Sequence, residues 1–370
     1  MARHRGRGAC SSPAPRYLAH SHHPDPDPDT PEAWSRPQTR VSTQRIGQVI
    51  SYNQSPDLPF DRSINPYRGC EHGCIYCFAR PSHAWLDLSP GLDFETRIIA
   101  RPDAPRRLAE ILRSPRYECR PIVIGTNTDC YQPIEKRLGI TRNLLEVLAE
   151  HRHPVSLLTK SNLVQRDMDL LAEMAKDGLA SVMVSVTTLD SELKRRLEPR
   201  TPSGARRLDT VRALSEAGIP TGVLLAPVIP ALNDHEIEAI ARVSAEAGAS
   251  SLSWVLLRLP HEVAPLFRDW LAEHYPDRAG KIMGMIQASR GGRDYDHRWG
   301  RRLRGEGPFA ELLARRIQLA CRRHGLDHDT RPRLETGLFR VPGRSGDQFT
   351  LFPQPAGSDS SLNSSGPHQK

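Results

Sequence analysis

Short apolar runs alternate along the middle of the chain with longer segments whose apolar residues recur three and four positions apart. The short runs predict strands at residues 121–125, 155–159, 181–186, 221–228 and 251–257, and a further strand in RSINPY, residues 62–67. The longer segments predict helices at 141–151, 166–178, 205–218 and 234–248, several ending in a glycine that suits a left-handed C-terminal cap. This alternation is typical of repeated βα units around a parallel sheet.

Six βα units are too few for an eight-stranded barrel. We therefore expect an α/β fold with a partial (β/α)6 TIM-type barrel of parallel strands over residues 46–277. A basic C-terminal extension with a long helix at 309–325 follows over 278–352 and is expected to be an appended cap. The ends, residues 1–45 and 353–370, are rich in Pro, Ser and Gly without apolar periodicity, so both termini are expected to be disordered.

Two absences in the sequence bear on the compartment. No apolar run approaches the ~18 residues of a membrane-spanning helix, and the basic N-terminus lacks the apolar stretch of a secretory signal. We therefore expect a cytoplasmic protein in a reducing environment. In such an environment the seven cysteines indicate metal or redox chemistry and argue against a disulfide framework.

The positive charge is concentrated near the C-terminus. The formal net charge is +8, and Arg278–Arg344 alone holds sixteen Lys and Arg against seven Asp and Glu. Tyr295, Trp299 and Phe309 are interleaved with these basic residues, a composition that suits nucleic acid. Two other interpretations stay open: an arginine-rich composition of the whole chain, or a salt-bridged loop that closes the barrel.

Three cysteines are clustered directly after the first predicted strand, in GCEHGCIYCFAR, residues 69–80. Cys70, Cys74 and Cys77 place three soft ligands on one loop, which suits zinc or an iron–sulfur cluster. A four-iron cluster held by three cysteines keeps one iron free of protein ligands. A zinc site would need His72 or His83 as the fourth ligand, and the spacing allows this. Three structural cysteines are a further interpretation, though a Gly-flanked loop is a poor place for core residues.

The C-x3-C-x2-C spacing, with Tyr76 before the last cysteine, resembles the signature loop of the radical S-adenosylmethionine (SAM) superfamily. Longer stretches such as TKSNLVQRDMDLL, RRLEPRTPSGARRLD and APVIPALNDHEI are similar to its bacterial DNA repair photolyase-like branch, which is related to spore photoproduct lyase. The resemblance covers residues 46–352. It implies a [4Fe-4S] cluster on Cys70, Cys74 and Cys77, with SAM on the remaining iron. Reductive cleavage of SAM then gives a 5′-deoxyadenosyl radical that abstracts hydrogen from a substrate, and the electron comes from a donor such as flavodoxin or ferredoxin.

The resemblance also implies which residues bind SAM. Thr126, Asn127 and Asp129 in GTNTD are expected at the methionine ammonium, and Lys160, at the end of the strand 155–159, at the carboxylate. Ser185 is expected at the ribose and Tyr76 at the adenine. A solvated Lys160 and a Ser185 bonded to backbone are the plainer alternatives.

Cys130 and Tyr131 are candidates for radical chemistry. The chain has TDCYQP where relatives in the branch usually have TDPYQP, so Cys130 stands in place of a proline beside the SAM loop. Spore photoproduct lyase uses a cysteine in this vicinity as a hydrogen donor, which suggests that role for Cys130 and a radical relay through Tyr131. A tolerated substitution is the alternative.

Three functions are compatible with these patterns. The first is a radical SAM enzyme that acts on a nucleic-acid base, such as repair of a pyrimidine photolesion, with nucleic acid bound through Arg278–Arg344. The second is a radical SAM enzyme that modifies a protein or small metabolite, and the third is a non-catalytic iron–sulfur sensor or binding protein. In addition, Gln348–Phe352 in GDQFTLF resembles the peptide by which bacterial proteins dock on the sliding clamp, although Phe349 and Phe352 would equally suit a cap on the barrel core.

Overall fold

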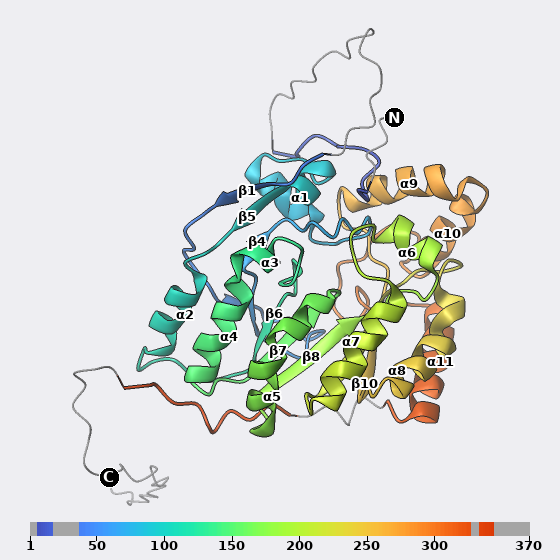
Figure 1. The fold of residues 1–370 in the computed structure, drawn as a ribbon. Coiled ribbons are helices and arrows are strands. Elements are labelled where there is room, and N and C mark those ends of the chain that lie inside the picture. Colours follow the sequence, from blue (N-terminus) through green and yellow to red (C-terminus); the bar gives the residue numbers. More distant parts are fainter. Residues whose placement is uncertain (1–5, 18–36, 327–332, 344–370) are drawn as a thin grey trace, which may run out of the picture.

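A seven-stranded sheet forms the centre of the protein (Figure 1). The computed structural model describes residues 6–17, 37–326 and 333–343. In the sheet order β10-β9-β8-β7-β6-β3-β2, six strands are parallel neighbours and β2 pairs antiparallel with β3 at the edge. The strands are β2 (Ser51–Tyr52), β3 (Arg62–Ile64), β6 (Ile122–Ile124), β7 (Val155–Thr159), β8 (Ala180–Ser185), β9 (Thr221–Val228) and β10 (Ser251–Leu256). The six predicted parallel strands and the partial-barrel fold are confirmed.

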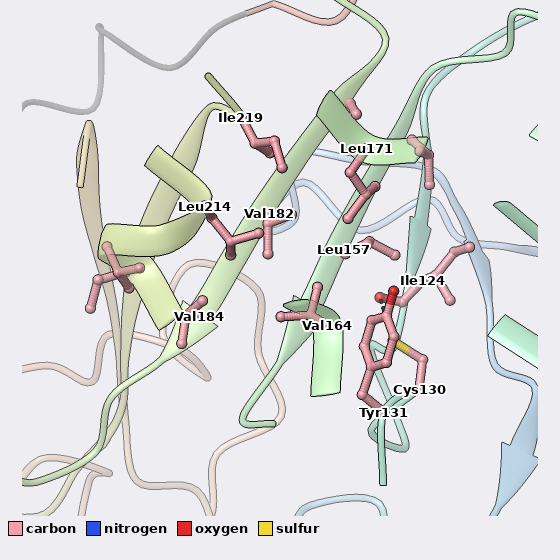
Figure 2. Packing of buried hydrophobic residues seen from close by; sticks show 14 of the residues in the cluster. Ile124, Cys130, Tyr131, Leu157, Val164, Leu171, Val182, Val184, Leu214 and Ile219 are labelled. Atoms are coloured by element: carbon pink, nitrogen blue, oxygen red, sulfur yellow. Dashed lines mark hydrogen bonds between the residues drawn. The ribbon is translucent and has the colours of Figure 1, made fainter. Parts of the chain in front are cut away.

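The two faces of the sheet differ because side chains alternate along a strand. On one face Leu157 of β7 lies opposite Val182 of β8, and both pack with Val184 in the main hydrophobic core beneath the helices (Figure 2). On the other face Ser181 Oγ donates to Ser156 Oγ at 3.0 Å. The helix-facing side of β7 and β8 is therefore apolar, and their opposite side carries the two serines beside Leu158 and Met183.

Helices follow the strands and cover the outside of the sheet (Figure 1). Asp190 and Ser203 begin α6 and α7 with side-chain caps that accept backbone N–H groups. Gly218 and Gly248, at φ 76° and 86°, follow α7 and α8 as the sequence predicts. The helices of this part are α2 (Ala104–Leu112), α3 (Glu135–Leu138), α4 (Ile140–Glu150), the 3-10 helix η2 (Asn162–Asp167), α5 (Met168–Lys176), α6 (Ser191–Leu197), α7 (Gly204–Glu216), the 3-10 helix η3 (Asp234–Glu236) and α8 (Ile237–Glu246).

A smaller three-stranded sheet lies beside the barrel, in the order β1-β5-β4. It consists of β1 (Arg40–Thr43), β4 (Tyr67–Arg68) and β5 (Arg97–Ala100), and the chain between β4 and β5 contains the 3-10 helix η1 (Arg80–Leu86) and α1 (Leu92–Thr96). β1 pairs parallel with β5, with Val41 opposite Ile98.

Within residues 1–45, for which the sequence predicts disorder, the structure describes 6–17 and 37–45 and gives them contacts with the rest of the protein. The backbone N–H groups of Gly8 and Ala9 donate to the buried carboxylate of Glu95 at 3.0 and 2.9 Å, and Ser11 Oγ donates to Asp269 at 2.6 Å. These bonds join residues more than 80 positions apart, and composition gives no sign of them. The polar N-terminal segment is held by backbone hydrogen bonds to a buried acid, although it lacks an apolar core of its own.

The C-terminal helices belong to the same body as the barrel. They are α9 (Val263–His274), α10 (Pro276–Ala288) and α11 (Pro308–His324). The predicted boundary between 277 and 278 falls inside α10. α11 lies beside α8, and its Leu313 and Ile317 are part of the main core, so this helix is no appended cap. The clamp-like Gln348–Phe352 and the tail 353–370 lie outside the described residues. No described helix is long and apolar enough to cross a membrane.

Candidate functional site

The three clustered cysteines lie on a loop that is fixed from both sides. Cys70 N donates to the carbonyl of Phe94 at 2.9 Å, and Ile75 N donates to the carbonyl of Leu197 at 3.1 Å. Gly69 enters the loop at φ 77°, where a Cβ would lie 2.9 Å from the Phe94 carbonyl oxygen, so the turn requires glycine. Cys70 and Cys74 are 7% and 8% exposed, and Cys77 is half-buried.

The three thiols are free and are close enough to influence one another. Burial, together with Asp129 and the other two thiols, raises the pKa of Cys70 well above its usual value. Burial, reinforced by Glu198, raises the pKa of Cys74 to about 12. Without a metal, Cys70 and Cys74 are therefore neutral thiols at pH 7. Metal binding would release the thiol protons, and the positive charge of the metal would stabilise the resulting thiolates.

The donor set fits an iron–sulfur cluster better than a single zinc ion. Within the described residues no three His, Cys, Asp or Glu side chains are arranged to hold one metal ion. The histidines that a zinc site would need face other groups: His72 Nδ1 lies 3.3 Å from Asp129 Oδ2, and His83 Nε2 lies 3.1 Å from the carbonyl oxygen of Arg97. A four-iron cluster binds each thiolate through a different iron, so it needs neither a fourth ligand nor three sulfurs around one ion.

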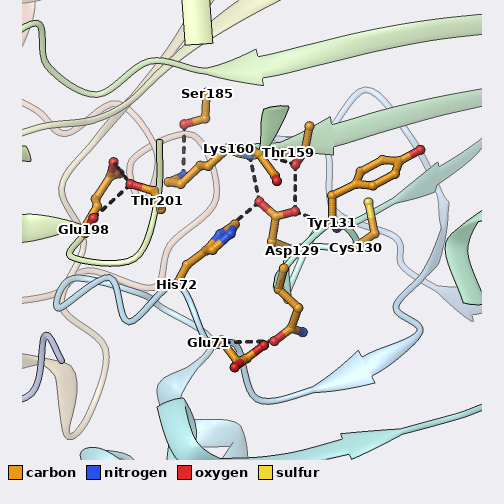
Figure 3. A network of polar contacts seen from close by, with 12 residues as sticks. Glu71, His72, Asp129, Cys130, Tyr131, Thr159, Lys160, Ser185, Glu198 and Thr201 are labelled. Carbon is orange, nitrogen blue, oxygen red and sulfur yellow. Dashed lines mark hydrogen bonds and ion pairs between the residues drawn. The ribbon is translucent and has the colours of Figure 1, made fainter. Parts of the chain in front are cut away.

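Asp129 joins three segments at the carboxyl end of the sheet (Figure 3). Its Oδ1 accepts from Tyr131 N at 2.8 Å and from Thr159 Oγ1 at 2.7 Å. Its Oδ2 accepts from Lys160 N at 2.7 Å and faces His72 of the cysteine loop. Four groups therefore occupy the roughly four acceptor sites of the carboxylate.

The pKa of Asp129 reflects these contacts. Burial would raise it, but the His72 ring and the hydrogen bonds from Lys160 N and Thr159 outweigh burial and lower the pKa to about 2. The sequence predicts that Asp129 binds the SAM ammonium. In the structure its oxygens are already used, so the carboxylate is placed to hold the cysteine loop against the ends of β6 and β7.

Lys160 and Ser185, which the sequence assigns separately to SAM, meet in the structure (Figure 3). Lys160 Nζ donates to Ser185 Oγ at 3.0 Å, and Ser185 Oγ in turn lies 3.4 Å from the carbonyl oxygen of Ala226. The ammonium is close enough to Cys74 to lower the pKa of that thiol, partly opposing the effect of burial. A cation at the end of β7 therefore lies beside the cysteine loop.

Thr126 and Asn127 lie on the loop after β6, and Asn65 holds this loop. Asn65 Oδ1 accepts from Asn127 N at 2.9 Å, and Asn65 Nδ2 donates to Thr126 Oγ1 at 3.4 Å. Thr126 is half-buried and Asn127 is exposed. Neither the Asn127 side-chain amide nor its carbonyl oxygen makes a recorded hydrogen bond with a described residue, so this rim position keeps its polar groups available.

Tyr76 is part of a buried polar network that the sequence does not reveal. Its hydroxyl donates to Glu198 Oε1, which also accepts from Thr187 Oγ1 at 2.8 Å. Glu198 Oε2 accepts from Arg207, whose Nη1 donates to the carbonyl of Ser185 at 2.9 Å. Burial would raise the pKa of Glu198, but Arg207 and Lys160 lower it to about 2. The network connects the aromatic residue of the cysteine loop to the end of β8.

Cys130 and Tyr131 lie in the main hydrophobic core (Figure 2). Cys130 is fully buried, with its Sγ at 4.0 and 3.9 Å from the carbonyl oxygens of Ile124 and Leu158. The Tyr131 hydroxyl donates to Asp167 at 2.9 Å. In Figure 3 both side chains lie on the far side of Asp129 from Lys160 and Ser185. This packing accounts for Cys130 without a catalytic role.

Many arginines of the basic segment are engaged within the protein. Arg302 pairs with Asp57 at 2.6 Å, and Arg316 pairs with Glu238 at 2.8 Å. Other intramolecular partners are those of Arg278 with the carbonyl of Ala231, Arg298 with Asp296, Arg301 with Glu306 and Arg304 with the ring of Trp254. Trp299 is 60% exposed, whereas Phe309 packs against the core. Much of the segment's positive charge is therefore paired within the protein.

Several residues of this site escape prediction from the sequence. Glu198 and Arg207 lie within motifs that the sequence marks as similar to the family, yet nothing in their spacing assigns a role. The spacing suggests His72 only as a zinc ligand, and not as the neighbour of Asp129 that it is. Glu198 and Arg207 lie nine positions apart, on either side of the start of α7, and form a pair with both side chains at most 1% exposed. A buried charge needs such a partner, but the sequence does not say which arginine supplies it.

Comparison with known proteins agrees with this geometry. Residues 64–243 match the model of the radical SAM superfamily. An uncharacterized protein of Mycobacterium tuberculosis is 34% identical over 304 residues, which cover 80% of this chain and 83% of the relative. An uncharacterized protein of Methanocaldococcus jannaschii is 29% identical over 214 residues, which cover 58% of this chain and 76% of the relative.

The fold also resembles that of solved structures. A mutant of spore photoproduct lyase superposes with a TM-score of 0.55 at 16% identity, covering 77% of this chain and 79% of the lyase. Another mutant of the lyase, with bound AdoMet and dinucleoside spore photoproduct, gives a TM-score of 0.54 at 15% identity over the same shares. At this identity the likeness shows the fold alone. With its family match, its extended identity to the mycobacterial relative, and its three-cysteine loop at the end of a six-stranded parallel sheet, the chain belongs to the radical SAM superfamily.

Proposed function

We propose that the protein binds a [4Fe-4S] cluster through Cys70, Cys74 and Cys77 and cleaves SAM to modify a substrate by hydrogen abstraction. The single observation that supports this most is the set of three free thiols, two buried and one half-buried, on one loop at the carboxyl end of the sheet. When bound, the cluster and SAM together supply a 5′-deoxyadenosyl radical. The chain's own residues bind, orient and shield these groups.

Lys160 is the residue best placed to bind the SAM carboxylate. It makes no recorded ion pair with a described carboxylate, and its Nζ lies beside Ser185 and near Cys74. An incoming carboxylate would give this ammonium a charged partner. Thr126 and Asn127 offer hydroxyl and amide groups for the SAM ammonium, and Asp129 acts indirectly by fixing Lys160 N and His72.

Lys160→Met should lower the affinity for SAM about tenfold or more, because the bond that it removes is charge-assisted. Lys176→Met is the matched control, since Lys176 is exposed and pairs with Glu173 on the surface. Equilibrium dialysis of the reconstituted protein against labelled SAM measures both. Equal affinities in the two variants would contradict the role of Lys160.

Shielding of the site comes from the segments packed on the cysteine loop. Arg200 N donates to the carbonyl of His72 at 3.4 Å, and a Cβ at Gly8 would overlap the Gly73 carbonyl oxygen. The N-terminal segment and the chain after α6 therefore touch the loop from different directions. Excluding water and oxygen protects both a reduced cluster and a carbon radical.

For the substrate we propose a nucleic-acid base. The excess of positive charge at Arg278–Arg344 and the exposed Trp299 support this class. Modification of a protein or small metabolite is the second candidate, and the internal pairing of many arginines of that segment favours it. Flavodoxin or ferredoxin is proposed as the electron donor. Docking of Gln348–Phe352 on the sliding clamp is proposed from the sequence alone.

The test is anaerobic reconstitution followed by measurement of 5′-deoxyadenosine with dithionite and SAM, with and without UV-irradiated DNA. Formation of 5′-deoxyadenosine supports the radical SAM reaction, and stimulation by irradiated DNA supports the substrate. Cleavage that no nucleic acid stimulates would move the substrate to the second class. Complete absence of cleavage from a cluster-loaded protein would favour a non-catalytic sensor.

A further inference from the structure

Arg258 carries a charge that nothing in the described part of the chain neutralises by direct contact. It lies two residues after β10, at the carboxyl end of the sheet. Its guanidinium carbon is 4.0 Å from the centroid of the ring of Phe78, the residue that follows Cys77 in the sequence. Within residues 6–17, 37–326 and 333–343 no hydrogen bond or ion pair of Arg258 is present. The cation is thus stacked on an aromatic ring of the cysteine loop with its N–H donors unused.

Arg258 is half-buried, and the fully buried arginines provide a contrast because each of them has partners within the protein. Arg80 pairs with Glu95 at 2.6 Å, and Arg207 pairs with Glu198. Arg290 donates to four backbone carbonyls, those of Arg301, Arg302, Leu256 and Leu257. None of the guanidinium nitrogens of Arg258 is buried without a partner, as Arg290 Nε is, so these donors stay accessible to a ligand.

The surroundings leave a net positive charge at this point. Burial lowers the pKa of Arg258, and the nearby groups that also affect it are Tyr295, Arg302, Cys77 and Asp57. Asp57 is already used, since it accepts from Arg302 at 2.6 Å and from Gly300 N at 2.6 Å. Arg290 is also close to Arg258, because burial and then the charge of Arg258 lower the pKa of Arg290 to about 10. Asp296 lies near Arg290 but pairs with Arg298, so Asp57 and Asp296 do not balance the four arginines around them.

The basic loop, residues 289–307 between α10 and α11, packs against the residues that precede Arg258. Arg290 bonds the carbonyls of Leu256 and Leu257, the two residues that precede Arg258, and also the loop carbonyls of Arg301 and Arg302. This anchoring brings Tyr295 near Arg258. Three aromatic or cationic side chains from distant segments, namely Phe78, Arg258 and Tyr295, therefore gather beside the cysteine loop.

We propose that Arg258 binds a phosphate group of the substrate and that the Phe78 ring, 38% exposed, packs against the adjoining base. A guanidinium matches phosphate oxygens with parallel N–H donors, and an aromatic ring provides a stacking face for any base. This inference rests on the proposed function and names residues that select its substrate. The phosphate would supply the missing negative charge, and the base would lie next to the cysteine loop.

The experiment compares variants of the full, cluster-reconstituted chain for binding of a twelve-nucleotide oligo(dT). Arg258→Gln should weaken binding about 10- to 100-fold, because it removes a charge-assisted contact. It should also reduce the slope of log affinity against log salt by about 0.7, the value for one phosphate contact on a single strand. Arg258→Lys, which keeps the charge and loses the fork of donors, should fall between Arg258→Gln and the wild type.

Arg293→Gln is the matched control, because Arg293 lies on the same basic loop, is exposed and has no recorded partner among the described residues. A probe with uncharged methylphosphonate linkages should bind the wild type more weakly and should not distinguish it from Arg258→Gln. Far-UV circular dichroism and cluster absorbance report whether each variant is folded and loaded.

Three results would overturn the inference: equal losses in Arg258→Gln and Arg293→Gln, an unchanged salt slope, or a wild type that does not bind the oligonucleotide. If Arg258→Gln instead shifts only the midpoint potential of the cluster, the arginine serves the cluster and the inference is also wrong. SAM cleavage is assayed separately. If the protein cleaves SAM but fails these binding tests, only the role of Arg258 is refuted. If the wild type does not cleave SAM, the proposed function is refuted.

Discussion

Replacing Asp129 by asparagine tests whether this carboxylate holds the cysteine loop on the sheet. The four groups that point at its two oxygens come from His72, Tyr131 N, Thr159 and Lys160 N. An asparagine keeps the shape but turns one oxygen into an amide that donates. Two of the four donors would then face a donor.

Two physical effects give the size of the expected loss of stability. The pKa of Asp129 falls from 3.8 to about 2, and a difference of ~1.8 units at ~1.36 kcal/mol per unit is about 2.4 kcal/mol of stability. Leaving two buried donors without an acceptor costs about 2 to 5 kcal/mol. Asp129→Asn should therefore lower the free energy of unfolding at pH 7 by about 2 to 5 kcal/mol.

Urea unfolding of the metal-free full chain measures this change, and its pH dependence checks the sign. Because the folded-state pKa lies below the unfolded one, the carboxylate's contribution is complete above about pH 5. It falls to about half by pH 3 and disappears as the pH drops through the folded-state pKa of about 2. The gap between wild type and Asp129→Asn should narrow accordingly on acidification.

Asp169→Asn is the control, since Asp169 is exposed, pairs with Arg142 on the surface and should lose less than about 1 kcal/mol. A loss for Asp129→Asn no larger than for this control, or a gap that widens below pH 4, would refute the reasoning.

Two further predictions concern the segments around the site. Glu198→Gln removes the partner of buried Arg207 and should lower the free energy of unfolding, measured in urea, by about 3 to 5 kcal/mol. The control Glu238→Gln, at the surface pair with Arg316, should lower it by less than about 1 kcal/mol. Similar losses in the two variants would contradict the prediction. Gly8→Ala should release the N-terminal segment from Gly73 and speed its proteolysis, whereas Gly47→Ala, with open space at its Cβ, should not. Equal protection of both variants would show that the segment is not packed on the loop.

The strands of the barrel can be predicted from the sequence because the pattern that specifies each strand lies within a few neighbouring residues. The strands at 155–159 and 221–228 coincide with β7 and β9, since alternating burial and a short apolar run decide a strand within a few residues. The N-terminal segment is different. Gly8 and Ala9 are held by Glu95, and a hydrogen bond to one acid almost ninety positions away leaves no pattern in the composition.

The site is predictable as a set of positions but not as a set of contacts. The cysteine spacing and the strand ends locate Lys160 and Ser185, which the structure brings to 3.0 Å. The sequence does not show that Asp129 has its acceptor sites filled by the protein, or that Cys130 points into the core. Which side of a loop a side chain occupies depends on the packing of segments from elsewhere in the chain, and the same holds for Arg258 on Phe78.

The central claim is that Cys70, Cys74 and Cys77 hold a four-iron cluster with one iron open to SAM. Electron paramagnetic resonance of the anaerobically reconstituted, dithionite-reduced protein tests it most directly. We predict a reduced-cluster signal that changes when SAM is added and is lost in Cys74→Ser. Zinc as the bound metal, or a cluster signal that stays the same with and without SAM, would contradict the account.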